Sequence, residues 1–458
     1  MASSLAIRTL YTHGPAAATP SRRRPPQACI EGPHGQGDGF AAIALRQGER
    51  APELSVSEQP DEPAAAKSPA EGRRTLAITC SAHFVHDGIA DAFYVLLPIW
   101  AQAFGLSYVQ VGTLRMAYSA AMALLQLPAG MLAERVGERA LLAGGSVLAG
   151  IAFALLATSQ SYPALGALIL LAGTGSAVQH PIASTLISKA YAATSRRAAL
   201  GIYNFVGDVG KMVVAAAMGL GIVAIGWRSS VVLYGLIVVG VGLVTLVALG
   251  SLSDGTPRAR SKGAPASAPG WGFTNPTGFA LLGAIQLIDS ACRTGFLTFF
   301  PFLLIAKGAS VASIGFGLSL VFVGGAAGKL VCGLIAERVG ILRTVILTEL
   351  ATGALIAAVV LAPLGWAMIL LMPAGVALNG TSSVLYGTVA EFVRDDRQSR
   401  SYGLFYTLGS AAGATAPFVF GLLSDFAGVP SALMLVAVLA ITTVPIALLL
   451  GPHIAKGA

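Results

Sequence analysis

The chain has 458 residues, of which 55% are hydrophobic and only 11% are charged, and its formal net charge at pH 7 is +8. Soluble domains carry about 25% charged residues, so this composition excludes an ordinary soluble enzyme, a nucleic-acid-binding protein with a basic patch, and a disordered scaffold. The four cysteines are scattered, without a C-x-x-C pair, so neither a disulfide framework nor a zinc site is expected. The excess of apolar residues indicates a protein embedded in lipid.

The first 75 residues differ in composition from the rest of the chain. They contain nine basic and eight acidic residues, many Pro, Ala, Ser and Gly residues, and no long apolar run. Such a segment cannot bury enough apolar surface to offset the entropy lost on ordering, so we expect residues 1–75 to form a disordered cytoplasmic tail. The first thirty residues carry arginines and no acid, so a targeting peptide is the alternative.

From Leu76 onward, long apolar runs follow one another with short breaks. Runs of about 18–25 residues are long enough to cross the ~30 Å hydrocarbon core of a bilayer. The sequence therefore predicts an all-α membrane protein with twelve transmembrane helices. We place them near 76–103, 109–133, 140–157, 163–188, 199–225, 229–250, 277–305, 312–335, 343–362, 365–389, 401–423 and 430–450.

Basic residues are unevenly distributed between alternate loops. The loops on one side of the membrane contain sixteen Lys and Arg residues, whereas those on the other side contain only Arg228 and Lys307. Because loops rich in Lys and Arg stay in the cytoplasm, we expect both termini and the central loop to be cytoplasmic. The protein is then a multi-pass protein of the cell (inner) membrane, and its basic charge needs no nucleic-acid partner.

The sequence contains an internal repeat. Residues 130–139 read GMLAERVGER and residues 333–342 read GLIAERVGIL, an offset of 203 residues, and around the same offset Asp87 corresponds to Asp289. Parallel repeats of this kind place a substrate site near the membrane midplane, between the two halves. The predicted parts are two pseudo-symmetric six-helix bundles at 76–250 and 276–451, a cytoplasmic linker at 251–275 and a C-terminal tail at 452–458.

Both copies of the repeat follow the pattern G-x-x-A-[DE]-R-x-G, which resembles the loop signature of the major facilitator superfamily. The resemblance covers residues 76–450 and implies a transporter with no catalytic residues, cofactor or metal. Its glycines allow close helix packing, and its Glu-Arg pairs can form cytoplasmic ion pairs that hold one gating state. The candidate gating residues are Gly130, Glu134, Arg135, Gly137 and Arg139 in the first copy, and Gly333, Glu337, Arg338 and Gly340 in the second.

A finer resemblance appears in the first half. The stretches at 82–87, 173–176 and 207–210, with His180-Pro181, look like the fosmidomycin-resistance branch of that superfamily. This implies proton-coupled efflux of a small anionic or drug-like molecule by a monomer. One departure is Val214-Ala215, where such exporters usually carry Gly-Pro. Proton-coupled uptake (symport) of a metabolite such as an organic acid is the alternative.

Eight charged residues lie deep in the predicted helices. At about 2.5–3.5 kcal/mol each, eight unpaired charges would cost roughly 20–28 kcal/mol, whereas folded proteins have margins of only about 5–15 kcal/mol. We therefore expect these side chains to pair with one another, to face a wet cavity or to become neutral. They are Asp87, Asp91, Asp208 and Asp289, and Arg115, Lys211, Arg293 and Lys329.

The candidate for proton coupling is Asp87, with Asp289 as the alternative. Asp87 has no basic residue three or four positions away, and His83 lies one helical turn before it. A carboxyl group in a low-dielectric surrounding takes up a proton more readily than in water, which a reversible proton carrier requires. His83 is a candidate proton relay.

The other buried charges suggest a gate and an anion contact. Asp91 and Arg115 lie at depths that differ by only ~6 Å, so we expect an ion pair between the first two helices, as an outer gate. Arginine and lysine bind carboxylates or phosphonates, and Arg293 or Lys211 is the expected first contact of an anionic substrate. His180 is expected to shape the fourth helix and, secondarily, to contact substrate.

Two acid–base pairs have the spacing of neighbours on a helix face. Asp208 and Lys211 are three residues apart, and Asp289 and Arg293 are four apart. Such pairs can neutralise one another locally. A purely structural pairing is therefore the alternative to a role in transport.

Overall fold

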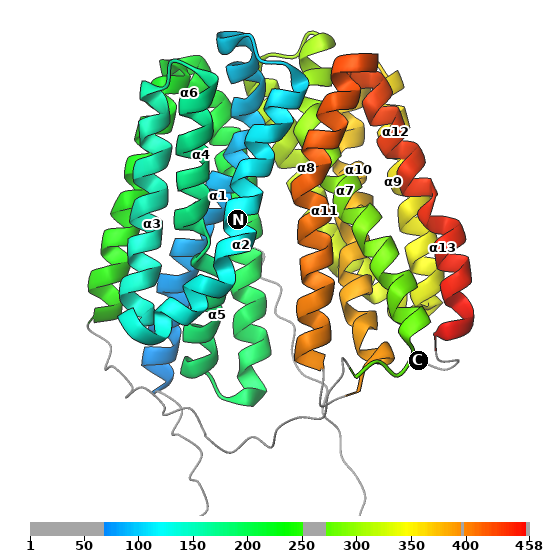
Figure 1. Cartoon of the computed structure of the whole chain (residues 1–458), viewed down its shortest axis with the longest axis horizontal. Helices are drawn as coiled ribbons and strands as arrows, with labels where there is room; N and C mark the ends of the chain where they lie inside the picture. The colour runs from blue at the N-terminus through cyan, green and yellow to red at the C-terminus, as the bar shows by residue number, and fades with distance from the viewer. Residues whose placement is uncertain (1–67, 251–271, 395–397, 455–458) are drawn as a thin grey trace, which may run out of the picture. The chain divides into compact units, whose positions relative to one another are not determined.

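The structure, a computed structural model, describes residues 68–250, 272–394 and 398–454 (Figure 1). Most of the predicted N-terminal tail and linker, and the end of the C-terminal tail, lie outside these residues. Within them the chain is helical, with no strand and only an isolated antiparallel bridge between Phe273 and Val393. The predicted all-α class is confirmed.

The helices of the two halves follow one another with short turns. The first half contains α1 (Pro69–Phe104), α2 (Tyr108–Val136), α3 (Glu138–Leu155), the 3-10 helix η1 (Leu156–Thr158), α4 (Tyr162–Ser176), α5 (Gln179–Ala190) and α6 (Ala193–Gly250). The second half contains α7 (Pro276–Ala306), α8 (Val311–Val339), α9 (Ile341–Leu361), α10 (Leu364–Thr388), η2 (Val389–Phe392), α11 (Gln398–Ala427), α12 (Val429–Ile441), α13 (Thr443–Leu450) and η4 (Gly451–His453).

The first helix begins at Pro69, earlier than the predicted start at residue 76. The Ser68 hydroxyl accepts a hydrogen bond from the Glu71 backbone N–H, and the Glu71 carboxylate accepts one from the Ser68 N–H. This capping box, followed by proline in the first turn, is a strong helix start. The polar residues after it extend the helix beyond its apolar run, which hydropathy alone did not indicate.

The predicted number of membrane crossings agrees with the described residues. Eleven helical segments are long and apolar enough to span a membrane, and one of them, Ala198–Gly250, has 53 residues. That segment is two helices that meet at Gly226, whose φ of 79° is not helical. A backbone with positive φ suits glycine because it lacks a Cβ. The break lies between the predicted spans 199–225 and 229–250, which gives twelve crossings.

The two halves form separate helix groups that meet along α2, α11, α6 and α8 (Figure 1). α3 and the part of α6 after Gly226 lie at the edge of one group, and α9, α12 and α13 at the edge of the other. The part of α6 before Gly226 contacts α8 of the other half.

Glycines let the halves approach closely. A Cβ on Gly112 of α2 would overlap the carbonyl oxygen of Pro417 on α11, and one on Gly315 of α8 would lie 2.5 Å from the carbonyl oxygen of Ala215 on α6. Small residues at these positions therefore permit backbone-to-backbone packing of the kind that membrane helices use.

Candidate functional site

A cavity of about 240 Å³ lies between the two halves. Its wall is built by α1, α2 and α6 of the first half and by α7, α8 and α10 of the second. Six of the eight predicted intramembrane charges line it, and they give the wall a formal charge of +2. These six are Asp91, Asp208, Arg115, Lys211, Arg293 and Lys329.

The remaining two predicted charges, Asp87 and Asp289, do not line the cavity but pair with residues that do. The Asp87 Oδ2 atom lies 3.3 Å from Lys211 Nζ, and the Asp289 Oδ2 atom lies 3.8 Å from Arg293 Nη2. All eight side chains therefore either line the cavity or pair with a residue that lines it.

A chain of ion pairs crosses from one half to the other. Lys211 Nζ lies 3.3 Å from Asp87 and 3.2 Å from Asp208, and the next link is Lys329 Nζ, 2.7 Å from Asp208 Oδ2. The spacing of Asp208 and Lys211 predicted their pairing. That spacing did not indicate the contact of Lys211 with Asp87 on α1 or the contact of Asp208 with Lys329 on α8, because both depend on how three helices pack together.

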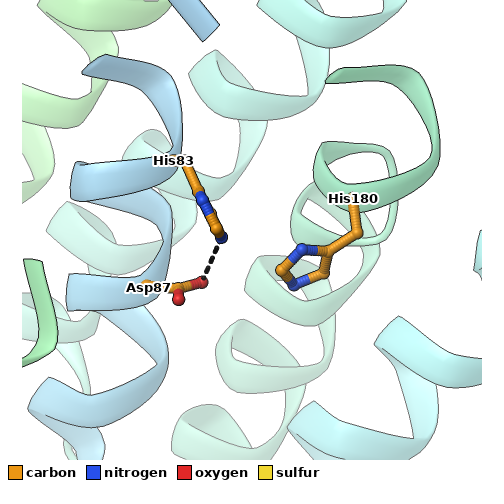
Figure 2. A group of neighbouring side chains, drawn as sticks. All are labelled: His83, Asp87 and His180. Carbon is orange, nitrogen blue, oxygen red and sulfur yellow. Dashed lines mark ion pairs between the residues drawn. The ribbon is translucent and has the colours of Figure 1, made fainter. Parts of the chain in front are cut away.

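Asp87 lies among histidines. His83 Nε2 is 3.2 Å and His86 Nε2 is 3.9 Å from Asp87 Oδ1, and all three side chains are buried. His83 Nδ1 lies 2.8 Å from the Tyr203 carbonyl oxygen. A carbonyl oxygen only accepts, so Nδ1 must carry the hydrogen. In the neutral ring, Nε2 then presents a lone pair near the Asp87 carboxylate (Figure 2).

The predicted ion pair between Asp91 and Arg115 is wrong for this conformation. The Arg115 guanidinium donates hydrogen bonds to the Ser119 hydroxyl (2.7 Å) and the Tyr94 hydroxyl (3.0 Å), and it lies over the Tyr94 ring. Tyr94 follows Asp91 by three residues on α1, so its ring shares that helix face and reaches Arg115. Asp91 lines the cavity and forms no hydrogen bond or ion pair with any residue the structure describes.

His180 lies in the first turn of α5, just after the break between α4 and α5. Its ring also meets two histidines of α1 edge-on, with centroid distances of 5.2 Å to His83 and 5.1 Å to His86. It does not belong to the cavity lining. The structure therefore places it beside Asp87 rather than at the expected substrate contact.

Sequence reasoning did not select Glu349 of α9 as a site residue. Its side chain is 1% exposed, and neither carboxylate oxygen has a hydrogen-bond partner among the described residues. The neighbouring hydroxyls are otherwise engaged, since Thr348 donates to the Thr344 carbonyl and Thr381 donates to Thr348. The signal available in the sequence was an acidic residue in a helix whose only other charged residue, Arg343, lies at the helix start.

The gating motif occupies corresponding turns in the two halves. Gly137 and Gly340 have φ values of 92° and 89° and each separates two helices. Arg139 lies next to Gly250, and the adjacent Glu138 pairs with Lys189 of α5 at 2.6 Å.

Two expectations about the motif are not met in this conformation. A Cβ on Gly130 or Gly333 would meet no described atom within 4 Å, because no other helix packs there, so these glycines are not at close helix contacts. Glu337 and Arg338 are exposed and form no ion pair within the described part of the chain, so the second copy of the motif lacks the ion pair that the sequence suggested. Arg135 is exposed as well, and the Glu134 side chain lies outside what the structure describes.

Comparison with known proteins agrees with this architecture. The family model described as Major Facilitator Superfamily matches residues 79–284 and 280–457. Two solved structures of a bacterial homologue to the human lysosomal transporter Spinster, both inward-facing, are similar to this chain at 18% sequence identity. The occupied form has a TM-score of 0.72 and the unoccupied form 0.71, and each alignment covers 86% of this chain and 100% of that chain. At this identity the likeness shows the fold alone.

Among curated proteins, none matches this sequence. The family match nevertheless spans nearly all of the helical residues, in two consecutive parts. Its members are membrane carriers of small solutes rather than enzymes. The chain belongs to the Major Facilitator Superfamily.

Proposed function

We propose that this protein is a proton-coupled secondary transporter of a small organic anion. The observation that carries the proposal is the position of Lys211. Its ammonium group lines the cavity between the halves and also pairs with Asp87, which lies outside the cavity among histidines. One cation is thus shared between a candidate solute site and a candidate proton site.

The charge and size of the cavity support an anionic solute of metabolite size. Four basic side chains face two acidic ones, and arginine and lysine are the side chains that bind carboxylate and phosphonate groups. The Arg293 guanidinium, 22% exposed, already lies at the wall. The volume of about 240 Å³ is below the roughly 300–1,000 Å³ typical of sites for drug-sized ligands.

The shared lysine supplies a coupling mechanism. Protonation of Asp87 removes its charge and releases Lys211 towards the cavity, where an anion can bind it. Conversely, an anion that attracts Lys211 leaves Asp87 without its cation and favours uptake of a proton there. By linkage the two effects are equal in free energy, so the proton and the anion favour the same state.

This linkage supports movement of the proton and the anion in the same direction, which is symport. Export in exchange for protons is the second candidate, because the stretches 82–87 and 207–210 resemble drug/proton antiporters. In either case alternating access requires the halves to rock about the cavity, with the Asp208–Lys329 pair breaking and reforming.

Proteoliposomes that contain a pH-sensitive dye would test the proposal. A panel of mono- and dicarboxylates and phosphonates is added outside, and the internal pH is followed. Symport predicts internal acidification with at least one anion, whereas antiport predicts alkalinisation. We expect Asp87→Asn to abolish the pH change while retaining counterflow of the anion, and Lys211→Gln to reduce counterflow at least tenfold.

The control variant is Lys189→Gln, which removes a lysine that pairs within one half. It should leave the pH change intact. The proposal would be overturned if no anion of the panel moved, or if Asp87→Asn still acidified the vesicles at the wild-type rate.

A further inference from the structure

We propose that His83, Asp87 and His180 form a binding site for a divalent transition-metal ion of the zinc class. One potential ligand atom of each residue lies within 4.8 Å of those of the other two. Figure 2 shows His83 and Asp87 on successive turns of α1 and His180 of α5 facing them. Ligands four residues apart on one helix face can bind the same ion.

The hydrogen bonding of His83 is that of a metal-binding histidine. Its Nδ1–H donates to the Tyr203 carbonyl oxygen at 2.8 Å, which fixes the ring orientation and leaves Nε2 as the coordinating atom. Ligand histidines usually have such a partner on the second nitrogen. The His83 ring is also stacked on the Tyr203 ring, with centroids 3.9 Å apart, so its position is held from two sides.

The separation of the first two ligand atoms suits a shared ion. His83 Nε2 and Asp87 Oδ1 are 3.2 Å apart, which is an ion pair when His83 is protonated and a contact of two acceptors when its ring is neutral. Two atoms that each lie about 2.0–2.1 Å from a tetrahedral zinc ion are about 3.3 Å apart. Two acceptors at this distance repel unless a proton on Nε2 or a metal ion lies between them, and a rotation of His180 brings in the third ligand.

The donor set selects the class of ion. Two imidazole nitrogens and one carboxylate suit zinc, cobalt, nickel or copper, whereas magnesium and calcium prefer oxygen ligands alone. A fourth donor is at hand, because His86 Nε2 lies 3.9 Å from the same Asp87 oxygen, is buried, and has no hydrogen-bond partner within the described ranges. No cysteine or sequence motif indicated this site, since His180 comes from a distant part of the chain.

The site lies outside the solute cavity, so the ion is an inhibitor rather than the cargo. None of the three ligands lines the cavity, but Asp87 Oδ2 is 3.3 Å from Lys211. A divalent ion on Oδ1 competes with Lys211 for the Asp87 charge. Lys211 also pairs with Asp208 at 3.2 Å, so it can move away from Asp87 and keep that second ion pair.

Zinc binding to the purified, untagged full-length chain tests this inference without any transport measurement. The background variant carries His13→Gln and His34→Gln, because these N-terminal histidines could bind zinc by themselves. Titration against a chromophoric chelator should give one site per chain. X-ray absorption should show ligands at about 2.0–2.1 Å, including imidazole nitrogen.

His83→Gln and His180→Gln should each weaken zinc binding by at least about 10- to 100-fold, the range that loss of an outer partner already costs. The matched control is His453→Gln. His453 contacts Asn275 in the second half of the chain, whereas the three ligands belong to the first half, so this substitution should leave the zinc affinity unchanged. The inference would be overturned if the background variant bound no stoichiometric zinc. It would also be overturned if His83→Gln or His180→Gln bound zinc as tightly as the background variant does. Either outcome leaves the proposed coupling to be judged by the vesicle experiment alone.

Discussion

The ion pair between Asp208 and Lys329 makes a testable prediction about the balance between conformations. Lys329 Nζ of α8 donates to both carboxylate oxygens of Asp208 on α6, at 3.0 and 2.7 Å. Within the described residues it is the ion pair that joins the two halves. Lys329→Met keeps the length and the apolar stem of the side chain and removes only its charge, so we expect it to depopulate this conformation.

The expected magnitude follows from the geometry. At 2.7 Å and an effective dielectric constant of about 20, two unit charges attract by about 6 kcal/mol. The Lys329 side chain is 42% exposed, so water screens much of this, and the net value of a hydrogen bond to a charged group is about 1.5–3 kcal/mol. The population of this conformation, relative to the conformation in which the Asp208–Lys329 pair is broken, should therefore fall by about 10- to 150-fold.

Pulsed electron resonance between spin labels can measure that ratio. Labels at Ser161, before α4, and Gly365, in the first turn of α10, would report the separation of the halves. Wild type, Lys329→Met, Asp208→Asn and the double variant form a double-mutant cycle. The control is Lys189→Met, which breaks a pair of 2.6 Å within one half and should leave the populations unchanged.

The cycle decides whether the pair itself is responsible. If the two single substitutions add to within about 0.3–0.5 kcal/mol, they act independently, and the pair does not hold this conformation. A shift by Lys189→Met as large as that by Lys329→Met would equally refute the reasoning.

Three further predictions concern stability and packing. Glu349→Leu should raise the unfolding temperature in a thermal melt, because a buried polar group without a hydrogen bond costs about 1–3 kcal/mol; a fall would show that the carboxyl group has a stabilising role. Gly315→Val should lower it, because a Cβ there lies 2.5 Å from a carbonyl oxygen of α6 and overpacking costs about 1–3 kcal/mol, whereas Gly144→Val, with no atom nearby, should not. Asp425→Ala should depopulate this conformation in the spin-label assay, since the carboxylate accepts hydrogen bonds from the Tyr108 and Val109 N–H groups of the other half at 2.7 and 2.8 Å; unchanged populations would contradict this.

Much of the fold follows from the sequence because lipid imposes one requirement on every crossing. Each span needs an apolar run of similar length, so hydropathy predicts the number and order of the helices. Even the break at Gly226 inside a continuous 53-residue segment was predictable. The same argument predicted that the intramembrane charges would gather, because unpaired charges in lipid are too costly.

Partner choice within the site was less predictable. Spacing along one helix predicted the pairs of Asp208 with Lys211 and Asp289 with Arg293. Contacts between helices depend on rotation about each helix axis, which a single sequence does not specify. Depth alone suggested Asp91 for Arg115, but Tyr94 and Ser119 bind that guanidinium.

Glycines at the two ends of the bundle differ in how closely they are packed in this conformation. At one end of the bundle, Gly112 and Gly421 are pressed against backbone of the opposite half. At the other end, a Cβ on Gly130 or Gly333 would meet no atom of another helix within 4 Å in the part of the chain that the structure describes, and the adjacent Met131 and Leu334 are 64% and 53% exposed. Glycine costs helix stability relative to alanine, so we expect Gly130 and Gly333 to be packed in a conformation in which these ends meet. A carrier must encode contacts for two states, and one structure satisfies only those of the state it shows.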